Sequence, residues 1–333
     1  MTKVSVVLAV YNSNLLYLQS QLDSIENQVR QPDELIITDD NSSNDTLIFL
    51  KNYSKNSSLN IKIITNNKNV GYSQNFMNGI KVATGDVIFL CDQDDIWDRD
   101  KIKAISNYFI DDESSLVVIH DQTRTNQDLI PERLTTIRAL AKRGIPTHEF
   151  VYGCATAFHR KILPFVLDCP DNVAYDNWIH LIGRIFNKRL IVPKCYMLFR
   201  RHPESTTIKP ILIREANITL FTSFYAKLYN YRKIWHTNSE QEHLIRANLK
   251  QSILNIHGKI PHMNTNMLHY GLNRIEAEIV FFKKRSILLG ENKLNALKSI
   301  FSINLFNYRL VGGMRILLRD LASTALFATR LKI

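Results

Sequence analysis

The sequence predicts an α/β fold, a mostly parallel β-sheet with helices on both faces, followed by a mainly helical, basic C-terminal region. Three observations lead to this prediction. Short aliphatic and β-branched runs alternate with helical periodicity in the first half of the chain, the connections between them are short, and the charge balance changes near residue 200. Such strand–helix alternation is typical of parallel sheets, which bind ligands at the carboxyl ends of their strands.

The expected elements follow one another closely. We expect strands at 4–10, 34–38, 61–65, 87–91 and 116–119, separated by helices at 15–29, 46–53, 74–83 and 99–109. Residues 122–150 lose this periodicity and are interpreted as an excursion over the site. Further strands are expected at 152–159, 190–192 and 196–199, with a helix at 175–186 and mostly helical structure from residue 211 onward.

The charge distribution predicts a domain boundary. The chain has 333 residues, 45% of them hydrophobic, which is enough for one large core or two smaller ones. Residues 1–200 carry 22 Lys and Arg against 23 Asp and Glu, whereas residues 201–333 carry 20 against 8. We therefore expect a first domain at 1–205 and a helical basic region at 206–333 that seeks an anionic surface.

The cysteines and the hydropathy pattern bear on localisation. The four cysteines form no Cys-x-x-Cys pair, so thiolate metal binding is not expected. Sparse cysteines fit a reducing compartment, here the cytoplasm. The uncharged stretch 4–22 is interrupted by Asn and Gln, so neither a signal peptide nor a membrane-spanning helix is expected.

Polar clusters follow the strands at 11–13, 39–45 and 92–95. Helix capping accounts for residues such as Ser43 and Asp45. It does not account for Asp92, Asp94 and Asp95, because three carboxylates within four residues repel one another unless a cation neutralises them. Hard oxygen ligands suit Mg²⁺ or Mn²⁺ bound together with phosphates. The cluster therefore predicts a divalent metal and a diphosphate ligand.

Four ordered motifs resemble glycosyltransferase family 2, which has the GT-A fold. They are Val-Val-Leu-Ala-Val-Tyr-Asn at 6–12, Ile-Thr-Asp-Asp-Asn-Ser at 37–42, Asn-Val-Gly at 69–71 with Asn75, and Leu-Cys-Asp-Gln-Asp-Asp-Ile-Trp at 90–97. The resemblance spans residues 3–101 and implies a GT-A type, Rossmann-like sheet. The last motif, with an Arg-His element at 200–202, also resembles bacterial rhamnosyltransferase-like enzymes of surface polysaccharide synthesis.

The resemblance implies a nucleotide-binding site for the sugar donor. Ala9 and Tyr11 would line the pocket for the base and ribose, and Asp40, helped by Asp39, would accept a hydrogen bond from a pyrimidine ring. Asn75 has two open interpretations, contact with the nucleotide sugar or a structural role at the start of a helix.

The resemblance also implies metal ligands. Asp92 would lie near the ribose and the metal, Asp94 would bind the metal directly, and Asp95 would either assist it or cap the helix that begins near Arg99. His202 would complete the metal shell or contact the diphosphate, the alternative being a surface histidine.

Two neighbouring arginines could act with that histidine. Arg200 or Arg201 would pair with phosphate oxygens, since guanidinium groups bind such oxygens in a bidentate manner.

An inverting transferase needs a base to take the proton from the acceptor hydroxyl. The family places an acidic residue before aromatic residues at the start of a helix, and Tyr175-Asp176-Asn177-Trp178 resembles that element. Asp176 is therefore the expected base. Its alternative role is a helix N-cap, and the alternative base is Asp171.

The expected function is that of an inverting glycosyltransferase in bacterial surface polysaccharide synthesis. It would move a sugar from a UDP- or dTDP-linked donor to a hydroxyl of a glycan or lipid-linked acceptor. A sugar nucleotidyltransferase is less favoured because residues 11–14 contain neither Gly nor a basic residue. A basic nucleic-acid-binding protein would have no use for the acidic cluster, so no nucleic-acid partner is expected.

The end of the chain predicts an amphipathic helix. Leu310, Met314, Leu317 and Leu321 fall on one helical face, and residues 294–333 hold six basic residues against the single acid Asp320. Such a helix could pack on its own protein. Basic residues also attract anionic headgroups, so we expect peripheral attachment at the inner face of the cell membrane.

Overall fold

The structure, a computed structural model, describes residues 2–203, 220–256 and 265–290, together with Leu317, Leu318, Asp320, Leu321 and Thr324. Residues 44, 113 and 143–148 lie outside this description, and for 220–237 only the backbone is described. The chain divides into two compact units, residues 1–208 with 260–263 and residues 209–259 with 264–333. Each unit is described separately below.

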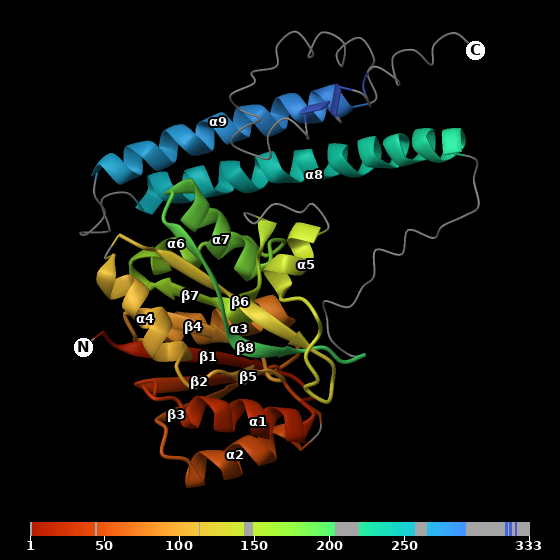
Figure 1. The fold of residues 1–333 in the computed structure, drawn as a ribbon. Coiled ribbons are helices and arrows are strands. Elements are labelled where there is room, and N and C mark those ends of the chain that lie inside the picture. Colours follow the sequence, from red (N-terminus) through yellow and green to blue (C-terminus); the bar gives the residue numbers. More distant parts are fainter. Residues whose placement is uncertain are drawn as a thin grey trace. The chain divides into compact units, whose positions relative to one another are not determined.

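The described part of the first unit is built on an eight-stranded sheet with the order β3-β2-β1-β4-β7-β6-β8-β5 (Figure 1). The strands are β1 Val4–Val10, β2 Glu34–Asp39, β3 Ile61–Thr65, β4 Val87–Cys91, β5 Ile96–Trp97, β6 Val117–Thr125, β7 Thr156–His159 and β8 Arg189–Arg200. The pairs β1–β2, β2–β3, β1–β4 and β6–β8 are parallel, whereas β7 runs antiparallel to β4 and β6, and β5 antiparallel to β8. The mostly parallel GT-A type sheet predicted from the sequence is confirmed.

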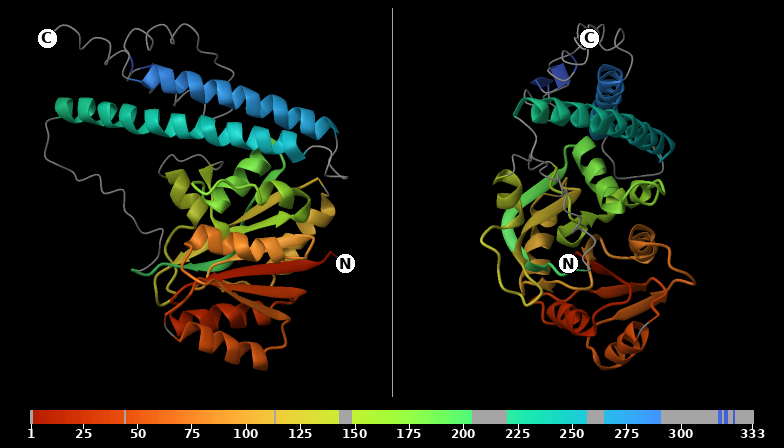
Figure 2. Two further views of the ribbon diagram at one scale, coloured as in Figure 1. Left: turned by 180° about the vertical axis from the view of Figure 1, so that it is seen from behind. Right: turned by 90° about the vertical axis from the view of Figure 1, so that its right-hand side faces the viewer.

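Helices cover both faces of this sheet (Figures 1 and 2). They are α1 Leu15–Glu26, α2 Thr46–Asn56, α3 Tyr72–Val82, α4 Lys101–Asp111, α5 Thr136–Lys142, α6 Leu163–Val166 and α7 Tyr175–Ile185, with short 3₁₀ turns η2 Gly153–Ala155 and η3 Arg160–Ile162.

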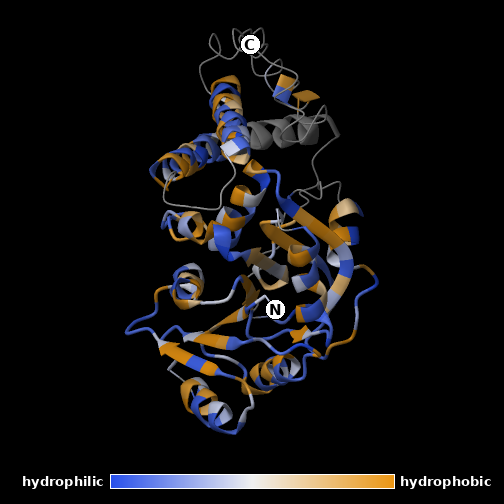
Figure 3. Cartoon of the chain, turned by 90° about the vertical axis from the view of Figure 1, so that its left-hand side faces the viewer, coloured by the Kyte–Doolittle hydropathy of each residue, from blue (hydrophilic) through white to orange (hydrophobic). Residues whose placement is uncertain are grey.

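Side chains along β1 point alternately to the two faces of the sheet, so neighbouring residues pack against different helices. Val6 and Leu8 belong to the core that also contains Leu18 of α1. Val7 points to the opposite face, where α3 approaches so closely that a Cβ on Gly79 would lie 2.5 Å from its Cγ1 atom. Both faces are therefore apolar, and the strands of the sheet appear mainly orange in Figure 3 while the helices are two-toned.

Three sequence expectations need correction in the second half of this unit. Residues 122–125 are part of β6 and not an excursion, and Gln122 is fully buried. The two strands expected at 190–192 and 196–199 are one strand, β8, which passes an irregularity at 193–194 where Pro193 has no N–H to pair. The strand expected at 152–159 begins only at Thr156, because η2 precedes it.

The described part of the second unit contains two long helices, α8 Leu220–Ile256 and α9 Thr265–Leu289, which lie side by side (Figures 1 and 2). Part of its basic charge is buried and paired internally. The Nε atom of Arg246 lies 2.6 Å from Glu278 Oε2, and that of Arg285 lies 2.7 Å from Asp320 Oδ2. Among the described residues, no helix has the length and apolar character needed to cross a membrane.

The predicted amphipathic helix at the end of the chain lies mostly outside the described residues. Of its apolar face, Leu317 is buried against Phe281 and Phe282 of α9, and Leu321 packs against the same cluster. At these two positions the apolar side chains pack within the second unit, as the alternative interpretation expected.

Candidate active site

A cavity of about 680 Å³ lies at the carboxyl ends of β1 and β4. The turn η2, the start of α7 and the end of β8 also contribute to its walls. Nine residues were predicted for the donor, metal and catalytic sites, and eight of them line this one cavity: Ala9, Tyr11, Asp40, Asn75, Asp92, Asp94, Asp176 and His202. The exception is Asp39, which is fully buried beside the cavity and accepts hydrogen bonds from the backbone and hydroxyl of Ser42.

Asp40 is held by three donors. It follows β2 directly, is 2% exposed, and accepts hydrogen bonds from Asn66 Nδ2 at 2.9 Å, from the N–H of Val70 at 2.8 Å and from the N–H of Gly71 at 2.9 Å. Gly71 has a φ of +85°, a conformation that side chains other than glycine's rarely adopt. The carboxylate is thus fixed at the cavity wall in one orientation.

Asn75 has the structural role that its sequence context left open, while its contact with the nucleotide sugar stays a prediction. Its side-chain amide donates to the carbonyls of Val10, at 3.3 Å, and of Thr38, at 2.9 Å, and its Oδ1 accepts from Asn66. These bonds tie α3 to the ends of β1 and β2. Asn75 also lines the cavity, so it can support the donor site by fixing the loop ends around it.

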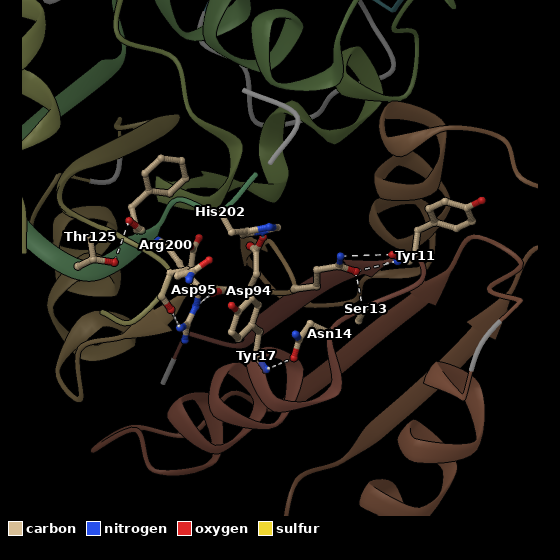
Figure 4. A network of polar contacts seen from close by, with 12 residues as sticks. Tyr11, Ser13, Asn14, Tyr17, Asp94, Asp95, Thr125, Arg200 and His202 are labelled. Carbon is tan, nitrogen blue, oxygen red and sulfur yellow. Dashed lines mark hydrogen bonds and ion pairs between the residues drawn. The ribbon is translucent and has the colours of Figure 1, made fainter. Parts of the chain in front are cut away.

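Gln93 is a site residue that the sequence interpretation missed. Its Oε1 accepts the backbone N–H of Tyr11 at 2.8 Å and the hydroxyl of Ser13, and its Nε2 donates to the carbonyl of Tyr11 (Figure 4). The amide therefore fixes the loop after β1 to the acidic segment after β4. The one sequence feature that could have indicated its role is its position within the Asp-Gln-Asp-Asp string at 92–95.

Asp94 and His202 form a pair at the cavity wall (Figure 4). The Nε2 atom of His202 lies 2.7 Å from Asp94 Oδ2, and their side chains are 12% and 20% exposed, respectively. The imidazole also lies near the ring of Tyr17, with the ring centroids 5.6 Å apart. His202 is thus not a solvated surface histidine, and its position fits a shared role with Asp94.

Arg200 fixes the backbone of the acidic segment. Its Nε donates to the carbonyl of Asp94 at 2.8 Å, one terminal nitrogen donates to the carbonyl of Gln127, and the guanidinium lies 4.1 Å from the ring centre of Tyr17. Arg201 pairs instead with Glu132. Much of the N–H donor capacity of Arg200 and Arg201 is therefore engaged within the protein. From the sequence, one of these two residues is expected to pair with phosphate oxygens.

Asp95 lies behind the cavity wall. It is fully buried, its Oδ1 accepts the backbone N–H of Arg200 at 3.0 Å, and its Oδ2 has no hydrogen-bond partner among the described residues. The capping alternative is wrong, because the N-cap residue of α4 is Asp100. Burial, with repulsion from Asp94 and Asp92, holds the pKa of Asp95 well above its usual range.

Asp92 lines the cavity and also lies close to the buried carboxylate of Asp95. Burial, followed by repulsion from Asp94, raises its pKa to about 7. One oxygen each of Asp92 and Asp95 and the thiol of Cys154 lie within 4.8 Å of one another. Three carboxyl groups in one segment, one of them with an unpartnered buried oxygen, form an oxygen-rich donor set that fits a hard divalent cation such as Mg²⁺ or Mn²⁺.

Asp176 lies in the first turn of α7 and lines the cavity. It is not the N-cap, which is Ala174, and the hydroxyl of Ser73 accepts the N–H of Tyr175 at 3.0 Å. Burial raises the pKa of Asp176, while hydrogen bonds from the backbone of Asn177 and Gly153 lower it. A half-buried carboxylate of this kind can act as a base, whereas Asp171 is exposed and outside the cavity lining.

This constellation agrees with a comparison to known families. The model of glycosyl transferase family 2 matches residues 5–165, which include β1 through β7 and the acidic segment. The chain carries a glycosyltransferase family 2 domain. The resemblance predicted from the sequence motifs is therefore confirmed. The match argues against a nucleotidyltransferase and against a nucleic-acid-binding protein.

Individual relatives of the glycosyltransferase are distant. An uncharacterised protein of Mycobacterium tuberculosis is 24% identical over 264 residues, which are 77% of this chain and 69% of that protein. The Escherichia coli UDP-Glc:alpha-D-GlcNAc-diphosphoundecaprenol beta-1,3-glucosyltransferase WfgD is 24% identical over 186 residues, 54% of this chain and 69% of its own. The crystal structure of S. aureus TarS 1-349 has a TM-score of 0.50 at 15% identity, and the match covers 98% of this chain and 90% of the chain in that structure, which has the same fold.

Proposed function

We propose that this glycosyltransferase is an inverting enzyme that moves a hexose or a deoxyhexose such as rhamnose from a UDP- or dTDP-linked donor to a hydroxyl of a glycan or lipid-linked acceptor in bacterial surface polysaccharide synthesis. The observation that carries the proposal is that Asp176 and the Asp94–His202 pair line the same cavity. In-line displacement at the anomeric carbon requires a base for the acceptor hydroxyl. It also requires a site for the diphosphate leaving group, here a cluster of acidic residues that would bind a metal ion.

The nucleotide would lie along the ends of β1 and β2. Tyr11, whose side chain is 46% exposed, offers a ring face to the base or the ribose, and Ala9 leaves room beside it. Asp40 would accept a hydrogen bond from the imide N–H of a pyrimidine. Because its carboxylate is already oriented by three donors, it would lose little freedom on binding.

Asp94 and His202, with Asp92 beside the ribose, would hold Mg²⁺ or Mn²⁺. An ion bound there would stabilise the negative charge on the nucleotide diphosphate as leaving group. The protein's part is to keep the ligands in place: Arg200 holds the carbonyl of Asp94, and Gln93 holds the neighbouring loop.

Asp176 would take the proton from the acceptor hydroxyl as its oxygen attacks the anomeric carbon from the face opposite the diphosphate. The oxygen–carbon bond to the acceptor forms, the bond between the sugar and the diphosphate breaks, and the configuration inverts. The raised pKa of Asp176 suits a base that works near neutral pH.

The acceptor and the location are inferred from chemistry and from relatives. WfgD, by its name, acts on a diphosphoundecaprenol-linked sugar, and we infer a comparable lipid-linked acceptor for this chain. Such acceptors are met at a membrane surface, so the basic residues of the second unit would hold the protein at the cytoplasmic face of the membrane.

A donor screen tests the proposal. UDP-glucose, UDP-galactose, UDP-N-acetylglucosamine and dTDP-rhamnose are incubated with the full chain and Mn²⁺, with and without a polyprenyl-diphosphate-linked N-acetylglucosamine. We expect acceptor-dependent release of UDP or dTDP from one donor and a product of inverted anomeric configuration by NMR. A retained configuration would contradict the inverting mechanism, and failure to consume any donor would contradict the proposed donor class.

A further inference from the structure

A lysine lies buried beneath the catalytic centre and takes no part in the mechanism described so far. Lys101, the first residue of α4, is 1% exposed. Its Nζ atom donates to the carbonyl of Cys154 at 2.8 Å, lies 3.7 Å from the ring centre of Trp97 and is 3.8 Å from Met197 Sδ. The ammonium therefore points into the protein and does not extend to solvent.

Burying an ammonium group has a large desolvation cost. One carbonyl, one aromatic face and one thioether offset only part of it. Burial accordingly lowers the pKa of Lys101 to about 8, and the nearby negative charges of Asp95 and Asp92 act in the opposite direction. An apolar residue such as Met would fill this position at lower cost, so the amino group has a role beyond packing.

The carbonyl that Lys101 holds belongs to a turn between the two halves of the site. Within η2, the thiol of Cys154 lies within 4.8 Å of a carboxylate oxygen of Asp92, and Gly153 lines the same cavity as Asp176. On its outer side the turn packs tightly, because a Cβ on Gly153 would lie 2.0 Å from the hydroxyl of Tyr175. One three-residue turn thus lies close to the donor-side carboxylate Asp92 and packs against Tyr175, the neighbour of the proposed base Asp176.

We propose that Lys101 is a positioning residue that fixes η2 through the carbonyl of Cys154 and thereby sets the distance between Asp92 and Asp176. This inference rests on the proposed function. In-line transfer depends steeply on the placement of the base relative to the donor, and a misplacement of about 1 Å can cost about 10²-fold in rate. The nucleotide would be held mainly by residues that follow β1, β2 and β4, so we expect its binding to respond less to a shift of η2 than the transfer step does.

The test compares two substitutions in the same helix of the full chain. Lys101→Met keeps an unbranched side chain that extends as far as Cε and removes the hydrogen-bond donor and the charge. Lys103→Met makes the same change at an exposed position two residues later and serves as the matched control. Three quantities are measured: the affinity for UDP with Mn²⁺ by calorimetry, the rate of consumption of the donor found in the screen, and the rate at which iodoacetamide alkylates each cysteine in the native protein.

For Lys101→Met we expect donor turnover to fall by about 10–100-fold, with the Kd for UDP and Mn²⁺ changed less than threefold. Cys154 should be alkylated at least tenfold faster, Cys91 of β4 should remain protected, and the melting temperature should be unchanged or higher. Lys103→Met should match the unmodified chain throughout.

Two results would overturn the inference. Unchanged turnover with Cys154 still protected would show that η2 does not need Lys101. A lower melting temperature with faster alkylation of both Cys91 and Cys154 would show a general role in folding. The alkylation measurement needs no donor, so a failed donor screen counts against the proposed function and leaves the tethering role of Lys101 measurable.

Discussion

His202 Nε2 lies 2.7 Å from Asp94 Oδ2, although the two residues are 108 positions apart in the sequence. The pairing of β5 with β8 explains this contact. Ile96 lies opposite Leu198 in an antiparallel register, so the residues just before β5 meet those just after Leu198. Arg200 strengthens the junction through the Asp94 carbonyl. The late Arg-His element therefore belongs to the same site as the acidic segment.

The first prediction concerns this pair. Asp94→Asn keeps the shape of the side chain but removes the negative charge that faces the cavity. We expect binding of UDP in the presence of Mn²⁺ to weaken by at least about 10–100-fold, since changes even to groups outside the metal's immediate ligands cost that much in metal sites. Calorimetric titration with UDP, with and without Mn²⁺, measures the loss.

Asp111→Asn is the matched control, because Asp111 is exposed at the end of α4. It should bind UDP and Mn²⁺ like the unmodified chain. Full donor turnover in excess EDTA would contradict the metal role of Asp94 and His202.

The second prediction is that Asp176→Asn leaves nucleotide binding nearly unchanged and lowers transfer by about 10²–10⁴-fold, as expected for loss of a general base. Asp171→Asn, on the exposed loop before α7, should transfer normally. Calorimetry separates binding from the chemical step. Equal activity of the unmodified chain and Asp176→Asn would move the role of base to another residue.

The pH profile gives a third prediction. Burial raises the pKa of Asp176, and a base works only when ionised. Transfer at saturating donor should therefore fall as the pH drops through this raised pKa, above the range in which ordinary aspartates titrate. The residual activity of Asp176→Asn should lack this acid limb. An identical acid limb in both proteins would assign the titration to a different group.

Much of the site could be predicted because parallel strands bring their carboxyl ends to one edge. Tyr11, Asp40 and Asp92 each follow such a strand, and they line one cavity. Asp39 does not line the cavity, because side chains alternate along a strand, and its help to Asp40 stays a prediction.

Other features depend on contacts that no local pattern reveals. Gln93 and Lys101 act on residues 82 and 53 positions away. At the start of α7, the N–H of Tyr175 donates to the hydroxyl of Ser73, 102 positions away, and the N-cap residue is Ala174, so the alternative of Asp176 as the N-cap is wrong. β8 is one strand and not the two expected, because its pairing with β6 resumes after an irregularity that contains Pro193.

The fourth prediction concerns the buried pair in the second unit. Asp320 is fully buried, and its oxygens accept from Arg285 Nε at 2.7 Å and from a terminal nitrogen of Arg285 at 3.1 Å. Asp320→Ala removes the carboxylate that pairs with this buried guanidinium. We expect a loss of about 3–5 kcal/mol in the free energy of unfolding of this unit. Urea unfolding followed by circular dichroism measures it.

The double variant Arg285→Met with Asp320→Leu tests the physical reason. Apolar replacement of a whole buried pair is often neutral or stabilising, so the double variant should recover most of the loss. A double variant as unstable as Asp320→Ala would show that packing, not the unpaired charge, causes the effect.

The last prediction concerns the membrane. Lys283 and Lys284 are exposed on α9, whereas Arg285 beside them is buried. Each basic residue near an anionic surface contributes about 1 kcal/mol, so replacing Lys283 and Lys284 with Gln should weaken binding to phosphatidylglycerol liposomes by about 30-fold at low salt, as measured by flotation. Charge replacement is a cleaner test than truncation of the chain, because removing the end of the chain also removes Asp320.

Replacing Lys51 and Lys55 of α2 with Gln is the charge-matched control and should leave flotation unchanged. If the full chain stays unbound at low salt, or if both double variants float equally well, attachment through this face of α9 is wrong.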